Sequence, residues 1–134
     1  MKLQQQQYSI PISLEAGIRS KKTYHLNLNQ YNKWYFQEKN QIKKLFKVKV
    51  AKAIRALKKV TKPCKITYVI YFYNKRLFDI DNVGCVLTKF NNDALVELGI
   101  LTDDNYTMIP ELVYKFGGVD KDNPRCEVII EEIV

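Results

Sequence analysis

The chain has few of the cysteine and histidine residues that form structural zinc sites and disulfide frameworks. Among its 134 residues there are three cysteines, Cys64, Cys85 and Cys126, and a single histidine, His25. The cysteines are odd in number and too widely spaced for a C-x-x-C clip, so neither a disulfide framework nor a structural zinc site is expected. Free thiols of this kind favour a reducing, cytoplasmic location.

Long apolar runs are also missing. The longest run, Ile66 to Tyr73, is too short to cross a bilayer, and the opening MKLQQQQ lacks the apolar core of a signal peptide. We therefore expect no membrane partner, and we interpret residues 1–7 as a frayed lead-in. Hydrophobic residues make up 46% of the chain and charged residues 27%, which is typical of a globular protein. The length predicts a single domain over residues 1–134.

Acidic residues are scarce in the first part of the chain. Residues 1–78 carry 18 of the 22 Lys and Arg residues but only two acids, Glu15 and Glu38, whereas residues 79–134 carry the other 12 acids. The net charge of +8 is thus divided into a basic part followed by an acidic part. This division predicts a phosphate-binding flank beside a cation-binding site. The alternative is that the lysine-rich segment is simply a solvated helix face.

A long basic helix is predicted from about residue 29 to 60. Apolar residues recur there at spacings of four and three, from Ile42 to Leu57, and make one apolar stripe. Lysines occupy much of the remaining surface. The aromatic residues 34–36, near its beginning, are expected to be core or dimer contacts, with base stacking as the alternative.

The other elements predict an α+β fold. A β-branched and aromatic run over residues 64–73 predicts a central strand covered on both faces. Asn82 is expected to cap a second helix, which runs to Leu98 and ends at Gly99. Further strands are expected at residues 8–12, 107–116 and 125–133. The expected architecture is a mixed β-sheet packed by the long basic helix and the second helix.

Acidic side chains recur at two places in the second part of the chain. Asp79 and Asp81 stand two residues apart in the segment FDIDN, and Asp103 and Asp104 follow beyond the second expected helix. Carboxylates two apart on an extended segment point the same way, so a third from a distant loop could close an all-oxygen site for Mg²⁺. Residues 103 and 104 would point to different sides, so only one of them is expected to join.

A structural role is the alternative for these carboxylates. Aspartates at turns commonly accept hydrogen bonds from nearby backbone N–H groups. This is the interpretation we prefer for Asp93, Asp120 and Asp122, and for Asp79 and Asp81 it stays open beside the metal site.

The order of these residues resembles the RusA-type Holliday-junction resolvases. The likeness comprises Asp-x-Asp-Asn, a lysine, Asp-Ala-Leu, Leu-Gly-Ile and Asp-Asp, at residues 79–82, 89, 93–95, 98–100 and 103–104. It also includes LNQY at 28–31 and VDKDNPR at 119–125, so it spans most of the chain. The resemblance implies a RusA-like fold and a small homodimeric endonuclease that uses Mg²⁺ or Mn²⁺ to place paired nicks across a four-way DNA junction. Many members are encoded by phages and prophages, which implies a bacterial host cell.

The resemblance assigns catalytic roles to four residues of this chain. Asp79, Asp81 and Asp104 match the metal ligands, with Asp103 as the reserve for the third position. Lys89 matches the lysine of the family, and its ammonium would stabilise the scissile phosphate or the leaving oxygen.

The chain departs from the family pattern before Lys89. The segment from Val83 to Lys89 is about four residues longer than in the shorter members, and Cys85 stands where a direct count places the lysine. One extra helical turn moves a side chain by about 5.4 Å along the axis, so Lys89 reaches the site only if a loop absorbs the insertion. The alternative for Lys89 is an i,i+4 ion pair with Asp93.

DNA contacts are expected from the basic part of the chain. Such contacts to phosphates give affinity without sequence readout. Lys75 and Arg76 are expected closest to the metal. Outlying phosphates are expected to contact Lys21, Lys22, Lys43, Lys44 and Lys47. Asn29, in the segment LNQY, either orients the substrate or closes a turn.

Taken together, the residues and the resemblance predict a Mg²⁺-dependent, structure-selective endodeoxyribonuclease. It would act on branched DNA as a homodimer and would need no small-molecule cofactor. One alternative is a non-catalytic basic module whose binding of nucleic acid is indifferent to divalent cations. The other is an inactive relative in which the insertion has displaced Lys89.

Overall fold

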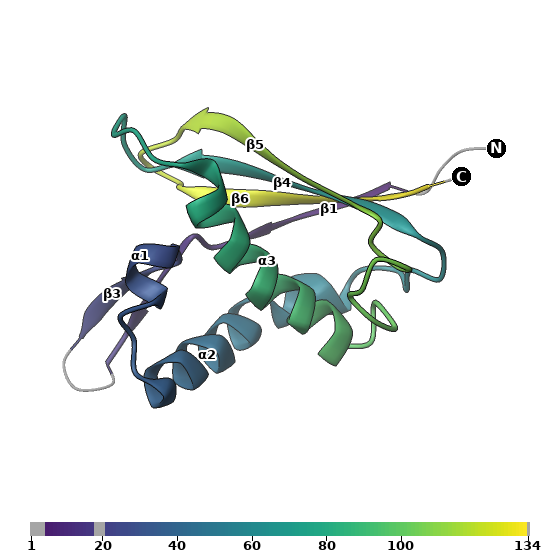
Figure 1. Ribbon diagram of the computed structural model, residues 1–134, viewed down its shortest axis with the longest axis horizontal. Helices are drawn as coiled ribbons and strands as arrows, with labels where there is room; N and C mark the ends of the chain where they lie inside the picture. The colour runs from purple at the N-terminus through teal and green to yellow at the C-terminus, as the bar shows by residue number, and fades with distance from the viewer. Residues whose placement is uncertain (1–4, 18–20, 134) are drawn as a thin grey trace.

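A computed structural model describes residues 5–17 and 21–133, which form one mixed β-sheet, a short β-hairpin and three helices (Figure 1). The chain is therefore an α+β protein, as predicted. In chain order the elements are β1 Gln5–Ile10, β2 Ser13–Ala16, β3 Lys22–His25, α1 Leu28–Tyr31, α2 Phe36–Arg55, β4 Cys64–Phe72, α3 Ile80–Glu97, β5 Glu111–Val119 and β6 Arg125–Glu132.

The four-stranded sheet has the order β1-β6-β4-β5. β4 runs parallel to β5 and antiparallel to β6, and β6 is antiparallel to β1. Parallel neighbours need a crossover connection, which α3 supplies between β4 and β5. β4 is therefore an interior strand, as predicted, and its Ile66, Tyr68 and Ile70 side chains are fully buried.

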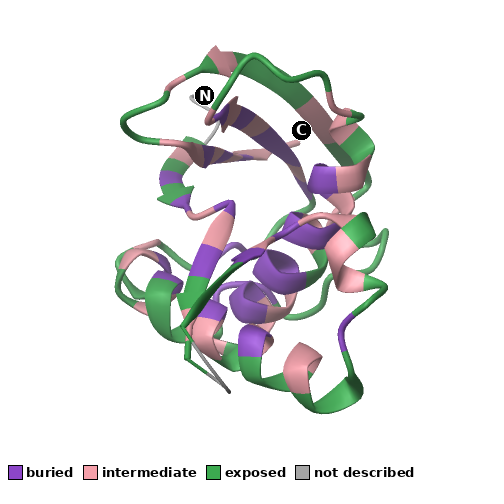
Figure 2. Ribbon diagram, turned by 90° about the vertical axis from the view of Figure 1, so that its left-hand side faces the viewer, coloured by how far each residue is buried: buried purple, intermediate pink, exposed green. Residues whose placement is uncertain are grey.

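Both long helices pack against the same face of the sheet (Figure 1). The buried stripe of α2 is the one that the apolar spacing predicted, Ile42, Phe46, Val50 and Ile54. It meets α3 through an edge-to-face contact of Phe46 and Phe90, with ring centroids 5.6 Å apart. Buried residues thus concentrate between the sheet and the helices (Figure 2). The prediction that β4 is covered on both faces is wrong for Val69 and Tyr71, which are only half-buried on the face without helices.

The first strand begins earlier than predicted. β1 starts at Gln5, so the expected frayed lead-in is wrong for Gln5 to Gln7, while residues 1–4 lie outside the described residues. The Gln6 side chain donates a hydrogen bond to the Lys58 carbonyl at 2.9 Å and accepts one from the Lys58 N–H at 2.6 Å. These two bonds attach the strand to the segment after α2.

The helix predicted over residues 29–60 is two helices, α1 and α2, separated by a turn that holds Trp34. Trp34 is only 7% exposed and meets the edge of the Tyr24 ring at 5.4 Å. Burial of this indole ring requires the chain to turn before α2 begins. Tyr35 and Phe36 are 72% and 74% exposed, so the expected core role holds for Trp34 alone.

Asn82 does not cap α3, contrary to prediction. The helix begins at Ile80, so Asp79 holds the N-cap position and Asn82 lies in the first turn. The other end is as predicted, because Gly99 has φ +82°, a conformation that favours glycine and ends the helix. No helix in the described part of the chain combines the length and the apolar character needed to cross a membrane.

β5 is an edge strand with an exposed apolar surface. It begins at Glu111, later than predicted, because a turn around Asn105 precedes it. Leu112, Phe116 and Val119 are 40%, 56% and 43% exposed along this strand. Exposed apolar side chains on a strand edge are a common feature of surfaces that pair with another chain.

Candidate functional site

A polar cleft of about 570 Å³ opens at the start of α3. Four parts of the chain meet there: the end of β3, α1 with its cap, the end of β4 with the following loop, and the first turn of α3. Its polar lining includes His25, Asn27, Asn29, Gln30, Arg76, Asp79 and Asn82. The cleft therefore brings two of the sequence-predicted site residues, Arg76 and Asp79, to the same place.

Stacked aromatic rings position Asp79. The Phe72 ring, at the end of β4, stacks on Phe78 at 4.0 Å and on Tyr73 at 4.3 Å, which holds the loop before α3 against the end of the sheet. Asp79 follows directly, with φ −81° and ψ 123°, and its side chain accepts no capping hydrogen bond from α3. The alternative of a capping role is therefore wrong for the Asp79 carboxylate, which is free to bind a ligand.

Asp81 lies on a different side of the helix start. Because α3 begins at Ile80, Asp81 is in the first helical turn, and the expectation that both carboxylates share one extended segment is wrong. Burial and then the nearby charge of Asp81 raise the pKa of the Cys85 thiol, and the same charge adds to the raised pKa of the Tyr114 hydroxyl on β5. Asp81 thus faces β5, whereas Asp79 lines the cleft.

Asp103 and Asp104 are not brought to these residues within one chain. They are exposed and follow the far end of α3, an 18-residue helix whose length is about 27 Å at 1.5 Å per residue. The Asp103 carboxylate accepts a hydrogen bond from the Asp104 N–H at 2.7 Å. Across residues 5–17 and 21–133, no three His, Cys, Asp or Glu side chains are grouped so that they could hold a metal ion.

Lys89 is exposed on α3, two turns after Asp81 and about 12 Å further along the axis. α3 is unbroken, so no loop absorbs the additional residues. The alternative ion pair with Asp93 is not formed, because Asp93 pairs with Lys43 at 2.6 Å. Cys85 lies between Asp81 and Lys89, since both charges act on the pKa of its thiol.

Only one of the two basic residues nearest the Asp79 motif lines the polar cleft. Arg76 lies between this cleft and a second groove and lines both, and its backbone N–H donates to the Asn74 side chain at 2.9 Å. Lys75 lines this second groove of about 350 Å³, which is mainly apolar and includes Leu77 and Phe116. Arg76 is therefore the predicted phosphate-binding residue that shares the cleft with Asp79.

The remaining predicted DNA contacts lie on other surfaces. Lys43 and Lys47 join α2 to α3 through ion pairs with Asp93 and Glu97, both at 2.6 Å. Lys44, between them, is exposed. At the start of β3, Lys21 lies 3.8 Å from Glu15 and the Lys22 ammonium lies over the Tyr24 ring at 4.8 Å.

Sequence reasoning missed His25 and left Asn29 open. Both line the cleft beside Asp79, because α1 packs against α3. The His25 ring stacks on Tyr73 at 5.4 Å, and its Nδ1 atom is buried without a hydrogen-bond partner. Two signals could have found these residues: His25 is the only histidine in the chain, and Asn29 lies in the segment LNQY.

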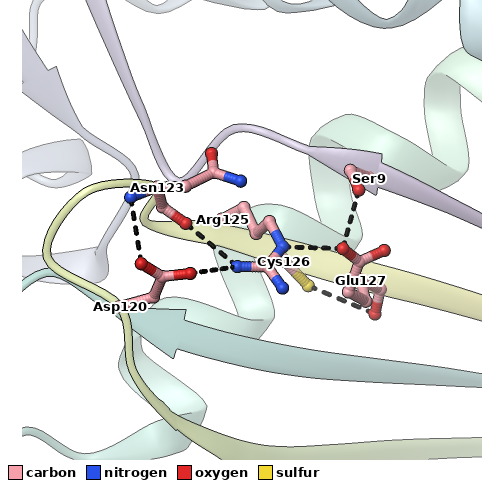
Figure 3. Close-up of polar contacts among 6 residues, drawn as sticks. All are labelled: Ser9, Asp120, Asn123, Arg125, Cys126 and Glu127. Atoms are coloured by element: carbon pink, nitrogen blue, oxygen red, sulfur yellow. Dashed lines mark hydrogen bonds and ion pairs between the residues drawn. The ribbon is translucent and has the colours of Figure 1, made fainter.

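A second polar cluster surrounds Arg125 on β6 (Figure 3). Its guanidinium donates to Asp120 at 2.9 Å and to Glu127 at 2.7 Å, and it lies over the Tyr71 ring at 4.2 Å. Burial alone would raise the pKa of Glu127, but hydrogen bonds from Arg125 and Ser9 lower it. The structural role preferred for Asp120 is confirmed, because its carboxylate also accepts from the Asn123 N–H at 3.2 Å.

The fold and the cleft define a small α+β protein in which a carboxylate, a guanidinium, an imidazole and four amides meet at a helix start. Comparison with protein-family models gives no match for the chain, and comparison with curated proteins gives none either.

Proposed function

We propose that the chain is a Mg²⁺-dependent, structure-selective endodeoxyribonuclease of the RusA type, which resolves four-way DNA junctions by paired nicks. One observation carries the proposal: the Asp79 carboxylate makes no capping bond and lines a cleft with Arg76, Asn29 and Asn82. A carboxylate oxygen is the ligand that Mg²⁺ prefers, and a guanidinium matches a DNA phosphate. The cleft can therefore hold a divalent cation and a phosphodiester side by side.

Asp79 is the carboxylate of the cleft that could bind the metal ion required by this chemistry. Bound Mg²⁺, or Mn²⁺ in its place, would supply an activated water and a counter-charge for phosphodiester cleavage. Asp79 would bind the ion in the cleft, and Asp81, in the first turn of α3, would bind the same ion only by turning from β5 toward the cleft. Arg76 would orient the phosphate. Lys89, two turns along the unbroken α3 from Asp81, would contact a neighbouring phosphate rather than the leaving oxygen.

A second copy of the chain would supply the third carboxylate. Within one chain, about 27 Å of helix separates Asp104 from Asp79 and Asp81. In a twofold dimer whose α3 helices run antiparallel, the end of one α3 lies beside the start of the other. Asp104 of the partner subunit, with Asp103 as the reserve, then completes the site.

The edge strand β5 supports this mode of assembly. It is nine residues long, pairs with β4 on one side only, and exposes Leu112 and Phe116. Antiparallel pairing of two β5 strands around an axis perpendicular to the sheet would join the two sheets edge to edge. Since α3 packs beside β5 on one face, the same axis would place both α3 helices on that face and antiparallel. Two sites in one dimer would serve the two opposed strands of a junction.

A junction-nicking assay tests the proposal. Purified protein is incubated with an end-labelled four-way junction or a matching linear duplex, in Mg²⁺ or in EDTA. We expect symmetric nicks confined to the junction that require Mg²⁺. Even outer-shell partners of metal ligands change activity about 10–100-fold, so Asp79→Asn and Asp81→Asn should each reduce nicking more than about 100-fold. The control Asp122→Asn, at an exposed loop position, should nick normally.

One observation favours a second candidate, a basic module that binds DNA without cleaving it: no metal-binding group of three carboxylates forms within the described part of one chain. This candidate predicts junction binding that weakens with salt and is indifferent to divalent cations. Binding with no nicks in Mg²⁺ or Mn²⁺ would support it and would contradict the nuclease.

A further inference from the structure

His25 has two ring nitrogens in different environments. Nδ1 is enclosed and has no hydrogen-bond partner. Nε2 is not among the enclosed unpaired atoms and bonds to none of the described residues, so it is at least partly accessible, and His25 is one of the residues that line the cleft. The ring itself is fixed by its stack on Tyr73 at 5.4 Å.

These environments determine which nitrogen carries the proton of the neutral ring. A proton on Nδ1 would be a buried donor with no acceptor, which proteins tolerate less well than an unpaired acceptor. The neutral imidazole therefore carries its proton on Nε2, which gives this cleft-lining residue an accessible N–H donor. The charged groups that line the cleft around it are Arg76 and Asp79.

The donors in the cleft match the oxygens of a phosphodiester. Arg76 offers a guanidinium, while Asn29 and Asn82 each offer an amide. We infer that His25 is a further substrate-contacting residue, whose Nε2–H donates to a non-bridging oxygen of a DNA backbone phosphate seated in the cleft. The inference rests on the proposed function, because it takes the ligand of the cleft to be DNA.

Three substitutions of His25 test the role of its Nε2–H donor separately from the role of its aromatic ring. In His25→Gln, the amide nitrogen stands near the position of Nε2 and can still donate. In His25→Asn, it stands near the position of Nδ1, and His25→Phe keeps a stacking ring without any donor. A role limited to packing against Tyr73 would instead favour phenylalanine over glutamine.

Binding is measured with a labelled four-way junction in Ca²⁺, and nicking is measured in Mg²⁺. A hydrogen bond to a charged group is worth roughly 10- to 100-fold in binding. We expect His25→Phe and His25→Asn to weaken junction binding by about that factor, and His25→Gln to stay within about threefold of the wild type. Thermal unfolding of each variant shows whether it folds. Wild-type binding by folded His25→Phe would overturn the inference.

A second measurement identifies the contact itself. Single methylphosphonates, which remove the charge of one phosphate, are placed in turn around the branch point. When the contacted phosphate is replaced, His25→Phe should weaken junction binding no further, whereas at the other positions it should weaken binding as much as on unmodified DNA. Equal weakening by His25→Phe at every position would overturn the inference, even if the protein nicks junctions normally. If the weakening disappears at one position in a protein that never nicks, the phosphate contact is supported and the nuclease is contradicted.

Discussion

At the scale of single residues, two buried tyrosines share a pair of asparagines on α3. The Tyr8 hydroxyl donates to the Asn91 carbonyl at 2.9 Å, and the Asn91 amide donates to the Tyr68 hydroxyl at 3.1 Å. Tyr68 in turn donates to Asn92. Burial raises the pKa of both hydroxyls above the ordinary tyrosine value of 10.0. The network therefore joins β1, β4 and α3 only while both tyrosines are neutral.

This network predicts a loss of stability at alkaline pH. Above pH 10 the tyrosines of the unfolded chain ionise while Tyr8 and Tyr68 stay protonated in the folded chain, so the free energy of unfolding falls as pH rises. Below pH 10 this contribution is fully present. Tyr8→Phe should make the fall shallower, and at pH 7 it should cost about 1–2 kcal/mol because Asn91 loses a partner. Urea unfolding between pH 7 and pH 11 measures both effects.

The exposed Tyr35 supplies the control for this experiment. Tyr35→Phe, at a position that is 72% exposed, should leave both the stability at pH 7 and its pH dependence unchanged. Equal pH dependence in Tyr8→Phe and the wild type would contradict the role of the buried network.

At the scale of elements, ion pairs hold α2 beside α3. Lys43 and Lys47 are only 43% and 40% exposed as side chains, and each lies 2.6 Å from its acidic partner. The hydrogen bond to Asp93 is the main reason that the pKa of Lys43 is raised. These two lysines therefore contribute to helix packing, whereas Lys44, exposed between them, makes no ion pair within the described chain.

Lys43 and Lys44 should respond differently to loss of charge. Lys43→Gln should lower the free energy of unfolding by up to about 1 kcal/mol, because it breaks a partly exposed ion pair. Lys44→Gln should leave stability unchanged and weaken junction binding, because one phosphate contact is lost. Urea unfolding and junction binding at two salt concentrations measure both variants. Equal junction binding by Lys44→Gln and the wild type would remove Lys44 from the DNA-binding surface.

Local patterns were sufficient to predict some of these elements. The stripe from Ile42 to Ile54 follows from helical spacing, and the end of α3 follows from Gly99, so both were predictable. The turn at Trp34 was not, because burial of that ring depends on Tyr24 in a distant hairpin. Short-range patterns thus predict where elements run but not where tertiary contacts interrupt them.

The candidate site was predictable only in part, for the same reason. Asp79 belongs to a local motif, and its place at the start of a helix could be expected. His25 joins it only because α1 and β3 fold back to the end of β4. Asp104 was expected to join Asp79 and Asp81, but the unbroken α3 separates them within one chain, and the sequence does not show which side of that helix meets another chain.

At the scale of the whole molecule, a site shared between subunits predicts complementation. Asp81→Asn and Asp104→Asn homodimers should both be inactive. Each mixed dimer contains one site that carries both substitutions and one intact site. Equal mixing makes about half of the dimers mixed, so roughly a quarter of all sites should be intact and nicking should recover to that extent. A site built within one chain gives no recovery. Nicking after the two proteins are unfolded and refolded together distinguishes these outcomes.

The proposed dimer surface provides a companion test. Leu112→Lys places a charge on the exposed edge strand β5, and Val48→Lys is its control on α2, at a position that is 72% exposed. Sedimentation should show monomers for Leu112→Lys and dimers for Val48→Lys, and only the second should nick. Dimeric Leu112→Lys would show that the subunits meet elsewhere.

The order of strands in the sheet also has a consequence for synthesis of the protein. β6 is the last element of the chain, yet it lies between β1 and β4 and pairs with both. Tyr8 therefore meets its neighbour Val128 only after all of the segments between them have been made. Such long-range pairing closes slowly. On the ribosome, β1 must stay without a strand partner until β6 emerges, so the four-stranded sheet is completed only after α2 and α3 have been made.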